Sequence, residues 1–558
     1  MSSLLSRLIV ARGRAPARRL LEARQAPVRV QEATLLRILA RNASCDFGRE
    51  HGFGRLRTAA DYRASVPVRD YEALRPYVEK MLAGGARVLC DDPPFMFGTT
   101  SGTTSQRKFI PINGCWARSL SSAMRLWLAR STLAHPALWQ GQVLTLVGST
   151  LEGRVPCGLP HGSVSGLTGA RVARVVKQRY ALPAAVTELS DHETRYEVAA
   201  RLMLERDVSL AAAPNATTLL RLAAVGAARS EAILRGIFEG RLGVSPRCDG
   251  DAALLGALDA QGRPNPGRAR ELEVAARAAG ALRPRDAWPS LAMIGCWLGG
   301  TAGSFARRLE AHYGPAPLRD LGLRATEATM TLPLEDGVAS GVPLVHDNYY
   351  EFVPESAAGG PNPPALGIGE LQVGQRYFIL LTTPAGLYRY DISDVVEVTG
   401  HYHELPLIEF VHKGPDMLNM TGEKLHARQV ALAVTLASEA LGHRLDRAQL
   451  VPDVASTRYD LLLETPRGTP LAELGAAIDQ ALMRLNPEYE LKRASGRLGA
   501  LRPVRMKQGW GERFEAADIA RGSRATQYKW PFVRQRWDEV SRSEVDEAGA
   551  RDPSLPGA

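Results

Sequence analysis

A run of glycines and hydroxyl side chains between Phe97 and Lys108 constrains this chain more than any other feature. Its twelve residues hold six hydroxyl side chains, two glycines and a terminal lysine. Glycines let a backbone approach a ligand closely, consecutive N–H groups can enclose an anion, and lysine adds a compact positive charge. The run therefore predicts a polyphosphate-binding loop, with a plain polar surface loop as the alternative. It is not a Walker loop, because Arg107 precedes Lys108 and Phe109 follows it.

The order of residues from Thr100 to Lys108, Thr-Ser-Gly-Thr-Thr-x-x-x-Lys, resembles the phosphate-binding loop of the adenylate-forming superfamily. That superfamily includes acyl-CoA ligases, luciferases and the adenylation domains of peptide synthetases. Ser105 and Arg107 stand where Gly and Pro are usual. The resemblance implies that phosphate is contacted by Thr100, Ser101, Gly102, Thr103, Thr104 and Lys108.

Composition excludes several classes of protein. With 558 residues the chain should form more than one domain, and 45% hydrophobic and 23% charged residues are ordinary for a soluble protein. No apolar run is long enough to span a bilayer, and six scattered cysteines without metal spacing predict reduced thiols in the cytoplasm. The net charge of +10 is spread along the chain, so we expect neither a nucleic-acid nor a membrane partner. The first 30 residues carry seven arginines, and we interpret them as a helical arm without a targeting role.

Lysine is rare in this chain and is therefore informative. Only eight of the 69 basic residues are lysines, so a basic position is usually arginine. Arginine cannot replace a compact ammonium group at a tight site. Four of the eight fall in candidate motifs: Lys108, Lys413, Lys424 and Lys529.

Hydrophobic spacing predicts an α/β organisation. Helices are expected over Gln31–Arg41, in two segments between Ala59 and Leu82 that are divided near Pro67, and over Cys115–Leu133. A strand is expected at Val143–Val147. Asn215 is expected to cap a helix, with a pocket-lining role as the alternative.

A second stretch predicts part of a parallel sheet. A strand at Leu291–Gly295, a glycine turn containing Gly300, a helix to about Tyr313 and a strand at Leu318–Leu323 form a βαβ pattern. We take Gly300 as a candidate nucleotide contact.

Three further motifs carry candidate site residues. Gly322–Glu327 follows a predicted strand and matches the superfamily's Thr/Ser-Glu motif, which makes Thr326 a nucleotide contact and Glu327 a Mg²⁺ ligand. A helix-capping Thr-Glu pair is the alternative. Gly386–Asp394 contains Asp394, which matches the ribose-binding aspartate, with Asp391 as a rival and a solvated strand-end turn as the alternative.

The third motif, Phe410–Lys424, resembles the superfamily's interdomain hinge. Lys413 would approach the ribose or phosphate, and Asp416 would lie near the pivot. A surface turn is the alternative.

Four segments in order narrow the resemblance: Ser65–Tyr77, Tyr350–Pro354, Gly386–Tyr390 and Gln527–Pro531. Together they look like the auxin-responsive (Gretchen Hagen type) acyl acid–amido synthetases, over about residues 30–535. The family implies a large N-terminal ATP-binding domain with parallel and mixed sheets (1–412) and a smaller mobile α+β domain (413–558). It also implies ATP and Mg²⁺, and an acyl-adenylate that is attacked by an amino acid's amine to form an amide.

The catalytic lysine is expected to be Lys529, with Lys424 as its rival and Lys108 acting on phosphate. We expect a monomer that acts on a small carboxylic acid and an amino acid. The alternatives are an acyl-CoA ligase that shares the adenylation step and a non-enzymatic protein that binds nucleotide or an anion.

Overall fold

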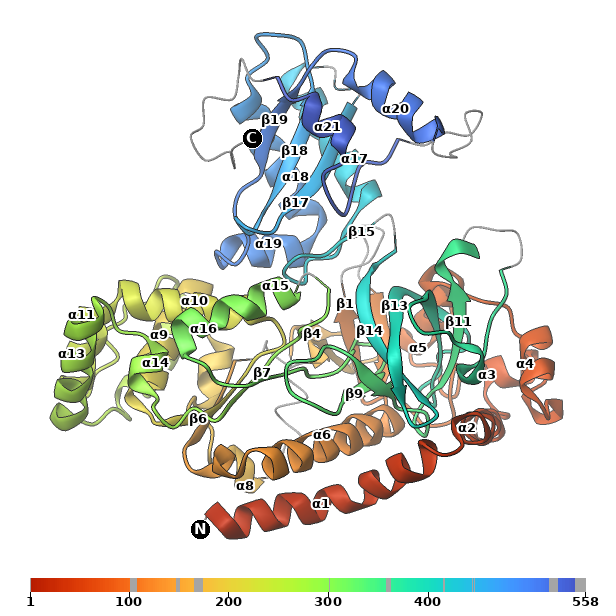
Figure 1. The fold of residues 1–558 in the computed structure, drawn as a ribbon, viewed down its shortest axis with the longest axis horizontal. Coiled ribbons are helices and arrows are strands. Elements are labelled where there is room, and N and C mark those ends of the chain that lie inside the picture. The colour runs from red at the N-terminus through yellow and green to blue at the C-terminus, as the bar shows by residue number, and fades with distance from the viewer. Residues whose placement is uncertain are drawn as a thin grey trace. The chain divides into compact units, whose positions relative to one another are not determined.

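The computed structural model of the chain describes residues 2–100, 108–146, 151–164, 174–300, 302–357, 363–414, 417–443, 445, 447–520 and 530–546. The chain divides into two compact units. The first comprises Met1–Thr100 and Lys108–His412, and the second includes Lys413–Ala558. Figure 1 colours both along the chain.

Two sheets of the first unit are formed by strands between residues 96 and 162 and between residues 331 and 413. The six-stranded sheet has the order β11-β12-β13-β14-β10-β9. Its strands are β9 (Thr331–Pro333), β10 (Gly341–Pro343), β11 (Tyr349–Pro354), β12 (Arg376–Thr382), β13 (Tyr390–Tyr402) and β14 (Leu405–Lys413). A four-stranded sheet of order β2-β1-β5-β4 is formed by β1 (Met96–Thr100), β2 (Lys108–Ile112), β4 (Gly153–Arg154) and β5 (Pro160–Gly162).

The third sheet of this unit is parallel and has the order β3-β6-β7-β8. Its strands are β3 (Gln142–Thr145), β6 (Val208–Ala212), β7 (Met293–Gly295) and β8 (Leu318–Arg319). The predicted βαβ pattern is confirmed, because β7 and β8 are parallel and helices α15 (Ala302–Ala306) and α16 (Glu310–Tyr313) lie between them. The predicted strand at Leu318–Leu323 is too long, since the buried carboxylate of Asp320 accepts the N–H of Gly322 at 2.5 Å and turns the chain.

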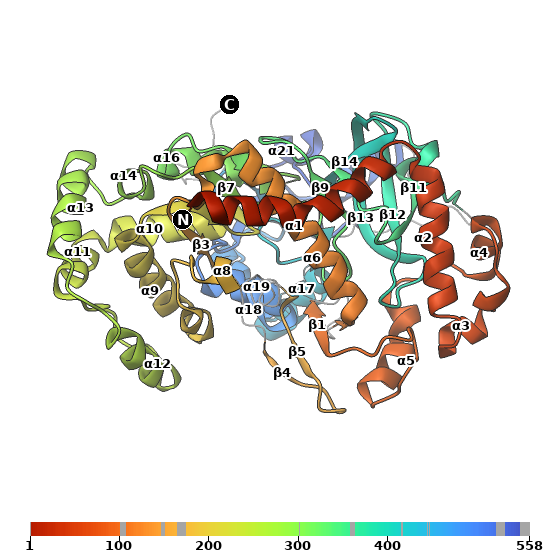
Figure 2. The same cartoon turned by 90° about the horizontal axis from the view of Figure 1, so that it is seen from below.

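The N-terminal segment is helical but is not a free arm. Helix α1 (Ser2–Ala23) lies along α6 (Gly114–Ala134), as Figures 1 and 2 both show. A Cβ added at Gly13 would lie 2.3 Å from Cβ of Ala129, so this glycine permits the close approach of the two helices. Leu5 and Ile9 are buried against the same core. The basic segment is therefore part of the first unit.

Capping side chains define where several helices begin. Asp70 caps α5 (Tyr71–Leu82), Asn113 caps α6, and Asn215 caps α10 (Ala216–Ala228) as predicted. The two helices expected between Ala59 and Leu82 are α4 (Ala59–Ser65) and α5, divided around Pro67. The other helices are α2 (Pro27–Arg41), α3 (Asp46–Glu50), α8 (Arg174–Lys177), α9 (His192–Glu205), α11 (Ser230–Glu239), α12 (Asp249–Asp259), α13 (Pro266–Ala279) and α14 (Pro284–Ala287).

The second unit is a small α+β fold. Its main sheet pairs β17 (Arg447–Asp453) antiparallel with β18 (Arg458–Glu464), and β18 parallel with β19 (Arg502–Met506). A two-stranded ladder joins β15 (Met417–Leu418) to β16 (Leu425–His426). Its helices are α17 (Ala427–Leu441), α18 (Leu471–Leu485), α19 (Pro487–Ala494), α20 (Trp510–Ala520) and α21 (Glu539–Ser543). A large unit with parallel and mixed sheets followed by a smaller α+β unit confirms the predicted fold class.

None of the described helices is both long and apolar enough to cross a membrane.

Candidate active site

The predicted phosphate loop lies between two paired strands. Strand β1 pairs antiparallel with β2, and Thr100 at the end of β1 faces Lys108 at the start of β2. The four residues between them that were assigned to phosphate, Ser101, Gly102, Thr103 and Thr104, lie outside the described residues. The pairing places Thr100 and Lys108 at the same end of the hairpin, on either side of the loop.

Tyr71 supports the start of β2. Its hydroxyl accepts the N–H of Phe109 at 2.8 Å, and the Nζ atom of Lys108 lies 5.4 Å from the centre of its ring. A cation at that distance from an aromatic face is attracted by the ring's negative face. Tyr71 therefore holds both the backbone of β2 and the ammonium group of its first residue.

The segment before α5 joins this hairpin to the six-stranded sheet. The N–H of Arg69 donates to the carbonyl of Arg389 at 3.1 Å, and the carbonyl of Arg69 accepts the N–H of Asp391 at 2.8 Å. Ser65–Tyr77 contributes to the family resemblance, but no residue of this segment was a candidate site residue. No local pattern signals this contact, because its partners lie more than 300 residues away.

Thr326 and Glu327 form the tip of a tight turn. The N–H of Ala325 donates to the carbonyl of Ala328 at 3.0 Å, and Arg324 pairs with Thr329. The turn lies seven residues beyond β8, so it does not directly follow the strand as predicted. It is an irregular connection between β8 and β9, not the start of a helix, so the capping alternative is wrong.

Three contacts fix this turn against the predicted site segments. A Cβ at Gly98 of β1 would lie 2.4 Å from Cγ2 of Thr326, so only glycine permits this packing. The indole N–H of Trp116 on α6 donates to the carbonyl of Thr326 at 3.0 Å. The hydroxyl of Tyr390, the first residue of β13, donates to Oε1 of Glu327 in a long hydrogen bond of 3.5 Å.

The carboxylate of Glu327 lies in a buried environment. Glu327 is 7% exposed, and Tyr390 is completely enclosed. Burial, and after it the negative charge of Glu327, hold the pKa of Tyr390 well above its ordinary value, so the phenol stays protonated and donates. Groups of three or more His, Cys, Asp or Glu side chains that could hold a metal are absent from the described part of the chain. A cation at Glu327 would therefore need oxygen ligands from phosphate or water as well.

Asp394 lies in a bulge of β13. Asp391 pairs with Leu380 and Val395 pairs with Phe378, so three residues of β13 face Ile379 alone. Ser393, in the bulge, has φ +58°, and its N–H donates to Oδ1 of Asp391 at 2.7 Å. Bulges re-aim side chains, and this one accompanies the burial of Asp394, which is 3% exposed. Both aspartates therefore lie inside a strand, and the alternative of a solvated strand-end turn is wrong.

Arg389 has a structural role beside this bulge. It has φ +45°, and its guanidinium donates to Oε2 of Glu351 at 3.0 Å, while Arg63 donates to Oε1 of the same carboxylate at 3.0 Å. The buried Glu351 of β11 thus joins α4 to Arg389, the residue before β13, and stabilises the backbone that precedes Asp391.

Gly300 lies against the end of β14. It has φ +55°, and a Cβ there would lie 2.8 Å from the carbonyl oxygen of Val411. Lys413 is the last residue of β14 and the first of the second unit. The glycine turn after β7 is thus brought next to the strand that leads into the predicted hinge. Asp416 lies outside the described residues.

Lys424, in the second unit, closes an unusually constrained turn. Glu423 is fully buried and accepts the N–H groups of Met420 at 2.6 Å and Thr421 at 2.7 Å, as well as the hydroxyl of Tyr459. Lys424 follows it with φ +46°, a conformation that costs a non-glycine residue free energy. Strain of this kind clusters at functional sites.

Lys529 itself lies outside the described residues, but the chain immediately after it is anchored. The indole N–H of Trp530 donates to the carbonyl of Ala448 at 2.8 Å, and the N–H of Leu450 donates to the carbonyl of Phe532 at 2.8 Å. The segment that follows Lys529 therefore adds to the edge of β17.

Comparisons with known proteins agree with this architecture. The GH3 family N-terminal domain matches residues 16–318, the GH3 family central domain matches 341–413, and the GH3 family C-terminal domain matches 428–536. The chain is 27% identical over 536 residues to indole-3-acetic acid-amido synthetase GH3.8 of Oryza sativa subsp. indica. This alignment covers 90% of the chain and 87% of the rice protein. The chain is 23% identical to indole-3-acetic acid-amido synthetase GH3.3 of Arabidopsis thaliana, with 90% and 88% covered.

A solved structure shares the fold. The chain superimposes on AtGH3.15 acyl acid amido synthetase in complex with 2,4-DB with a TM-score of 0.64, at 22% identity, covering 96% of each chain. The N-terminal family model alone spans more than half of the sequence. This chain belongs to the GH3 family.

Proposed function

We propose that the chain is an ATP-dependent acyl acid–amido synthetase. It would adenylate a carboxylic acid with release of pyrophosphate, and then transfer the acyl group to the amine of an amino acid with release of AMP. The observation that carries the proposal is the convergence of β1, the Thr326–Glu327 turn and β13 through Gly98, Trp116 and Tyr390. The relatives that align with 90% of this chain are named amido synthetases, and this supports the amide product.

The chemistry requires phosphate and acid to be held together. A carboxylate is a poor electrophile, and forming its mixed anhydride with AMP creates a good leaving group. Lys108, Thr100 and the predicted loop residues Ser101, Gly102, Thr103 and Thr104 are assigned to the phosphates of the substrate ATP. A fixed ammonium group stabilises the charge that builds on the α-phosphate during attack.

Glu327 fits a magnesium ligand. Its carboxylate is buried and oriented by a protonated phenol, which resembles the way protein metal ligands are held by their neighbours. When bound, Mg²⁺ would neutralise phosphate charge and act as a Lewis acid. Asp394 is assigned to the ribose hydroxyls, and Gly300, Thr326 and Lys413 to the remaining nucleotide contacts.

The two units are assigned different roles. We infer that residues 1–412 bind ATP and the acyl acid, and that residues 413–558 form a mobile domain that supplies the catalytic lysine. Lys529 is our first choice, supported by the anchored segment after it, and Lys424 is the rival, supported by its strained backbone. The six free thiols support a reducing, cytoplasmic setting, and we propose a monomer.

Mass spectrometry of products tests the proposal. The protein is incubated with ATP, Mg²⁺, a pool of carboxylic acids, the amino acids and coenzyme A. An N-acyl amino acid together with AMP is expected and identifies both substrates. A thioester would assign the chain to the acyl-CoA ligases, and no ATP consumption with any acid would contradict the enzymatic function.

Substitution of each candidate lysine then assigns the roles. Lys529→Ala or Lys424→Ala should slow adenylation strongly while the protein remains folded. If both variants release pyrophosphate at the wild-type rate, the assignment of a catalytic lysine to the second unit is wrong.

A further inference from the structure

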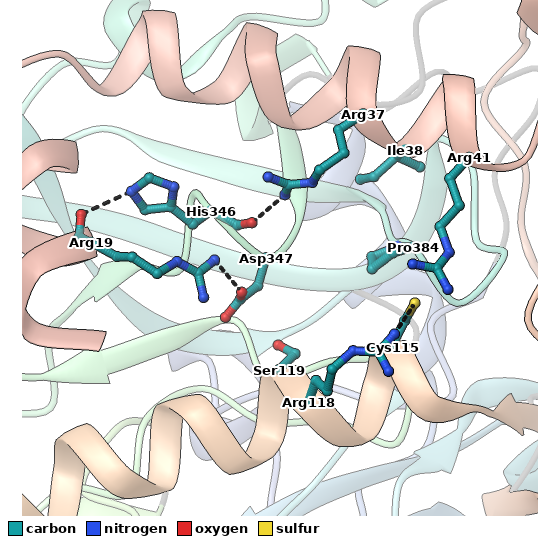
Figure 3. Close-up of a pocket in the computed structure, with 10 residues that line it drawn as sticks. All are labelled: Arg19, Arg37, Ile38, Arg41, Cys115, Arg118, Ser119, His346, Asp347 and Pro384. Carbon is teal, nitrogen blue, oxygen red and sulfur yellow. Dashed lines mark hydrogen bonds and ion pairs between the residues drawn. The ribbon is translucent and has the colours of Figure 1, made fainter. Parts of the chain in front are cut away.

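A cavity in the first unit gathers four arginines from three helices. Its volume is about 220 Å³, and it lies among α1, α2, α6, the turn before β11 and the residue Pro384 after β12. Figure 3 shows the side chains that line it. They are Arg19, Arg37, Ile38, Arg41, Cys115, Arg118, Ser119, His346, Asp347 and Pro384. We call this the arginine cavity.

The positive charge of the arginine cavity is only partly neutralised. Arg19 pairs with Asp347 at 2.7 Å. Arg41 and Arg118 share a single oxygen of Asp92, at 3.5 and 3.6 Å, and these distances are too long for strong hydrogen bonds. Four guanidinium groups thus face two carboxylates.

The excess of positive charge over negative charge is clearest at Arg37. Its guanidinium donates to two neutral acceptors, the carbonyl of His346 and the hydroxyl of Thr34. Burial first, and then the positive charge of Arg19, lower the pKa of Arg37. His346 adds no charge at neutral pH, since burial lowers the pKa of its imidazole. The side chains of Arg41 and Arg118 are 44% and 66% exposed, so water screens part of the repulsion among these like charges, and a bound anion would relieve the rest.

Ser119 adds a neutral donor to the same space. Its Oγ atom is buried, and no hydrogen-bond partner for it exists among the described residues. Figure 3 shows its hydroxyl rising from α6 on the side where Asp347 and Arg118 lie. Buried hydroxyls nearly always have a partner, and because water does not reach this oxygen, its hydroxyl would donate to an anion in the cavity only after a change of the Ser119 side-chain rotamer.

We propose that the arginine cavity binds an oxyanion of the phosphate class, either free phosphate or the phosphate of a monoester. A guanidinium group presents paired N–H donors that match phosphate oxygens, and a phosphate carries close to two negative charges at neutral pH. That charge balances the two excess positive charges. The serine hydroxyl would supply one further donor to an oxygen after a rotation about χ1.

The cavity is connected to the candidate active site through α6. Arg118 and Ser119 lie in its first two turns, which also carry Trp116, the donor to the carbonyl of Thr326. Helix α6 itself begins directly after β2. An anion in the cavity would tie α1, α2 and α6 together at the point where α6 supports the Thr326–Glu327 turn. The proposal does not depend on the proposed amide synthesis.

Calorimetric titration of the full chain in a buffer free of phosphate and sulfate tests the proposal. Inorganic phosphate and glycerol 3-phosphate are the two probes. Saturable binding is expected, weakening as NaCl is added because salt screens the charges. Arg37→Gln/Arg118→Gln should bind about 100-fold more weakly, about 10-fold for each lost charge-assisted pair. Tighter binding of glycerol 3-phosphate would identify a monoester as the ligand, and equal binding would identify the free ion.

Two matched variants separate this cavity from other anion sites. Arg277→Gln removes an exposed arginine on α13 that pairs with Glu273, and it should bind like the wild type. Lys108→Ala removes the predicted phosphate-loop lysine and should also retain the binding. Loss of binding in Lys108→Ala, or wild-type affinity in Arg37→Gln/Arg118→Gln, would overturn the proposal.

A milder variant keeps the test valid if the double variant does not fold. Ser119→Ala leaves every charge in place and removes only the orphaned hydroxyl. It should weaken phosphate binding by about 3- to 10-fold, the worth of one hydrogen bond. Unchanged affinity in Ser119→Ala together with an unfolded double variant would count against the site.

Discussion

The packing of Gly98 against Thr326 gives the sharpest test of how this site is held together. In Gly98→Ala the new methyl group would lie 2.4 Å from Cγ2 of Thr326 and 2.9 Å from Cγ1 of Val164. Carbon atoms in contact prefer separations of about 3.5–4.0 Å, so β1 and the turn must move apart by about 1 Å. Such overpacking costs about 1–3 kcal/mol of unfolding free energy.

The same displacement should reduce activity if this turn holds the nucleotide. A misplacement of about 1 Å in a catalytic site can cost about 100-fold in rate. We therefore expect Gly98→Ala to lower pyrophosphate release by about 10- to 100-fold, measured with saturating ATP and acid. Denaturant unfolding of the same samples gives the stability change.

A second substitution should restore part of both losses. Thr326→Ser removes the Cγ2 atom that clashes and keeps the hydroxyl, so the double variant should lose less than the sum of the two single variants, by about 0.5–3 kcal/mol. Gly54→Ala is the control, since a Cβ there has no atom within 4 Å and should leave stability unchanged. Wild-type stability and activity in Gly98→Ala, or no recovery in the double variant, would refute the reasoning.

Three further predictions concern single side chains. Lys424→Gly should raise the unfolding free energy of the second unit by up to about 1 kcal/mol, because glycine tolerates φ +46°. If Lys424 is the catalytic lysine, the variant should also slow adenylation, and unchanged pyrophosphate release in this variant and in Lys424→Ala would exclude that role. Tyr390→Phe removes the donor to Glu327 and should weaken Mg²⁺ binding, so that the Mg²⁺ concentration for half-maximal pyrophosphate release rises by about 10-fold. An unaltered Mg²⁺ titration would contradict the role of Glu327.

The third of these predictions concerns pH. Burial, and then the charge of Arg497, lower the pKa of Lys492 from 10.5 to about 7. The folded state therefore binds fewer protons than the unfolded state between about pH 7 and 10.5, and this lysine's cost grows as pH falls through that window. Lys492→Met should be more stable than the wild type at pH 6.5, and the gap should shrink by up to about 1.4 kcal/mol per pH unit as pH rises. A gap that does not change with pH would refute the shift.

Local signals predicted the parts of the fold that depend on neighbours in sequence. Asn215 caps a helix because its side chain accepts the N–H of Thr217, two residues away, at 3.0 Å. The break between α4 and α5 follows from Pro67, and the glycine turn after β7 follows from the strand and helix on either side. The predicted strand at Leu318–Leu323 was too long because the carboxylate of Asp320, the residue directly after β8, is buried. It accepts the N–H of Gly322 two residues on and the N–H of Leu298 at 2.6 Å, and hydrophobic spacing does not show either bond.

The residues of the candidate site divide in the same way, into those that short motifs predict and those that only the folded structure identifies. The motifs containing Lys108, Glu327 and Asp394 could be chosen because each is a short pattern with recognisable chemistry. The residues that join them could not be chosen, because Tyr71, Trp116 and Tyr390 act on partners from 38 to 210 residues away.

The sequence by itself determined the family, several helices, the βαβ unit from Leu291 to Leu318, and the residue types that suit phosphate, magnesium and ribose. These depend on local backbone preference, on hydrophobic spacing and on short motifs, all of which can be identified within short segments of the sequence. Only the tertiary structure decided that Gly98 meets Thr326, that a bulge accompanies the burial of Asp394, and that arginines from α1, α2 and α6 surround one cavity. Those contacts come from packing distant segments to native density, and no local pattern specifies which distant surfaces will meet.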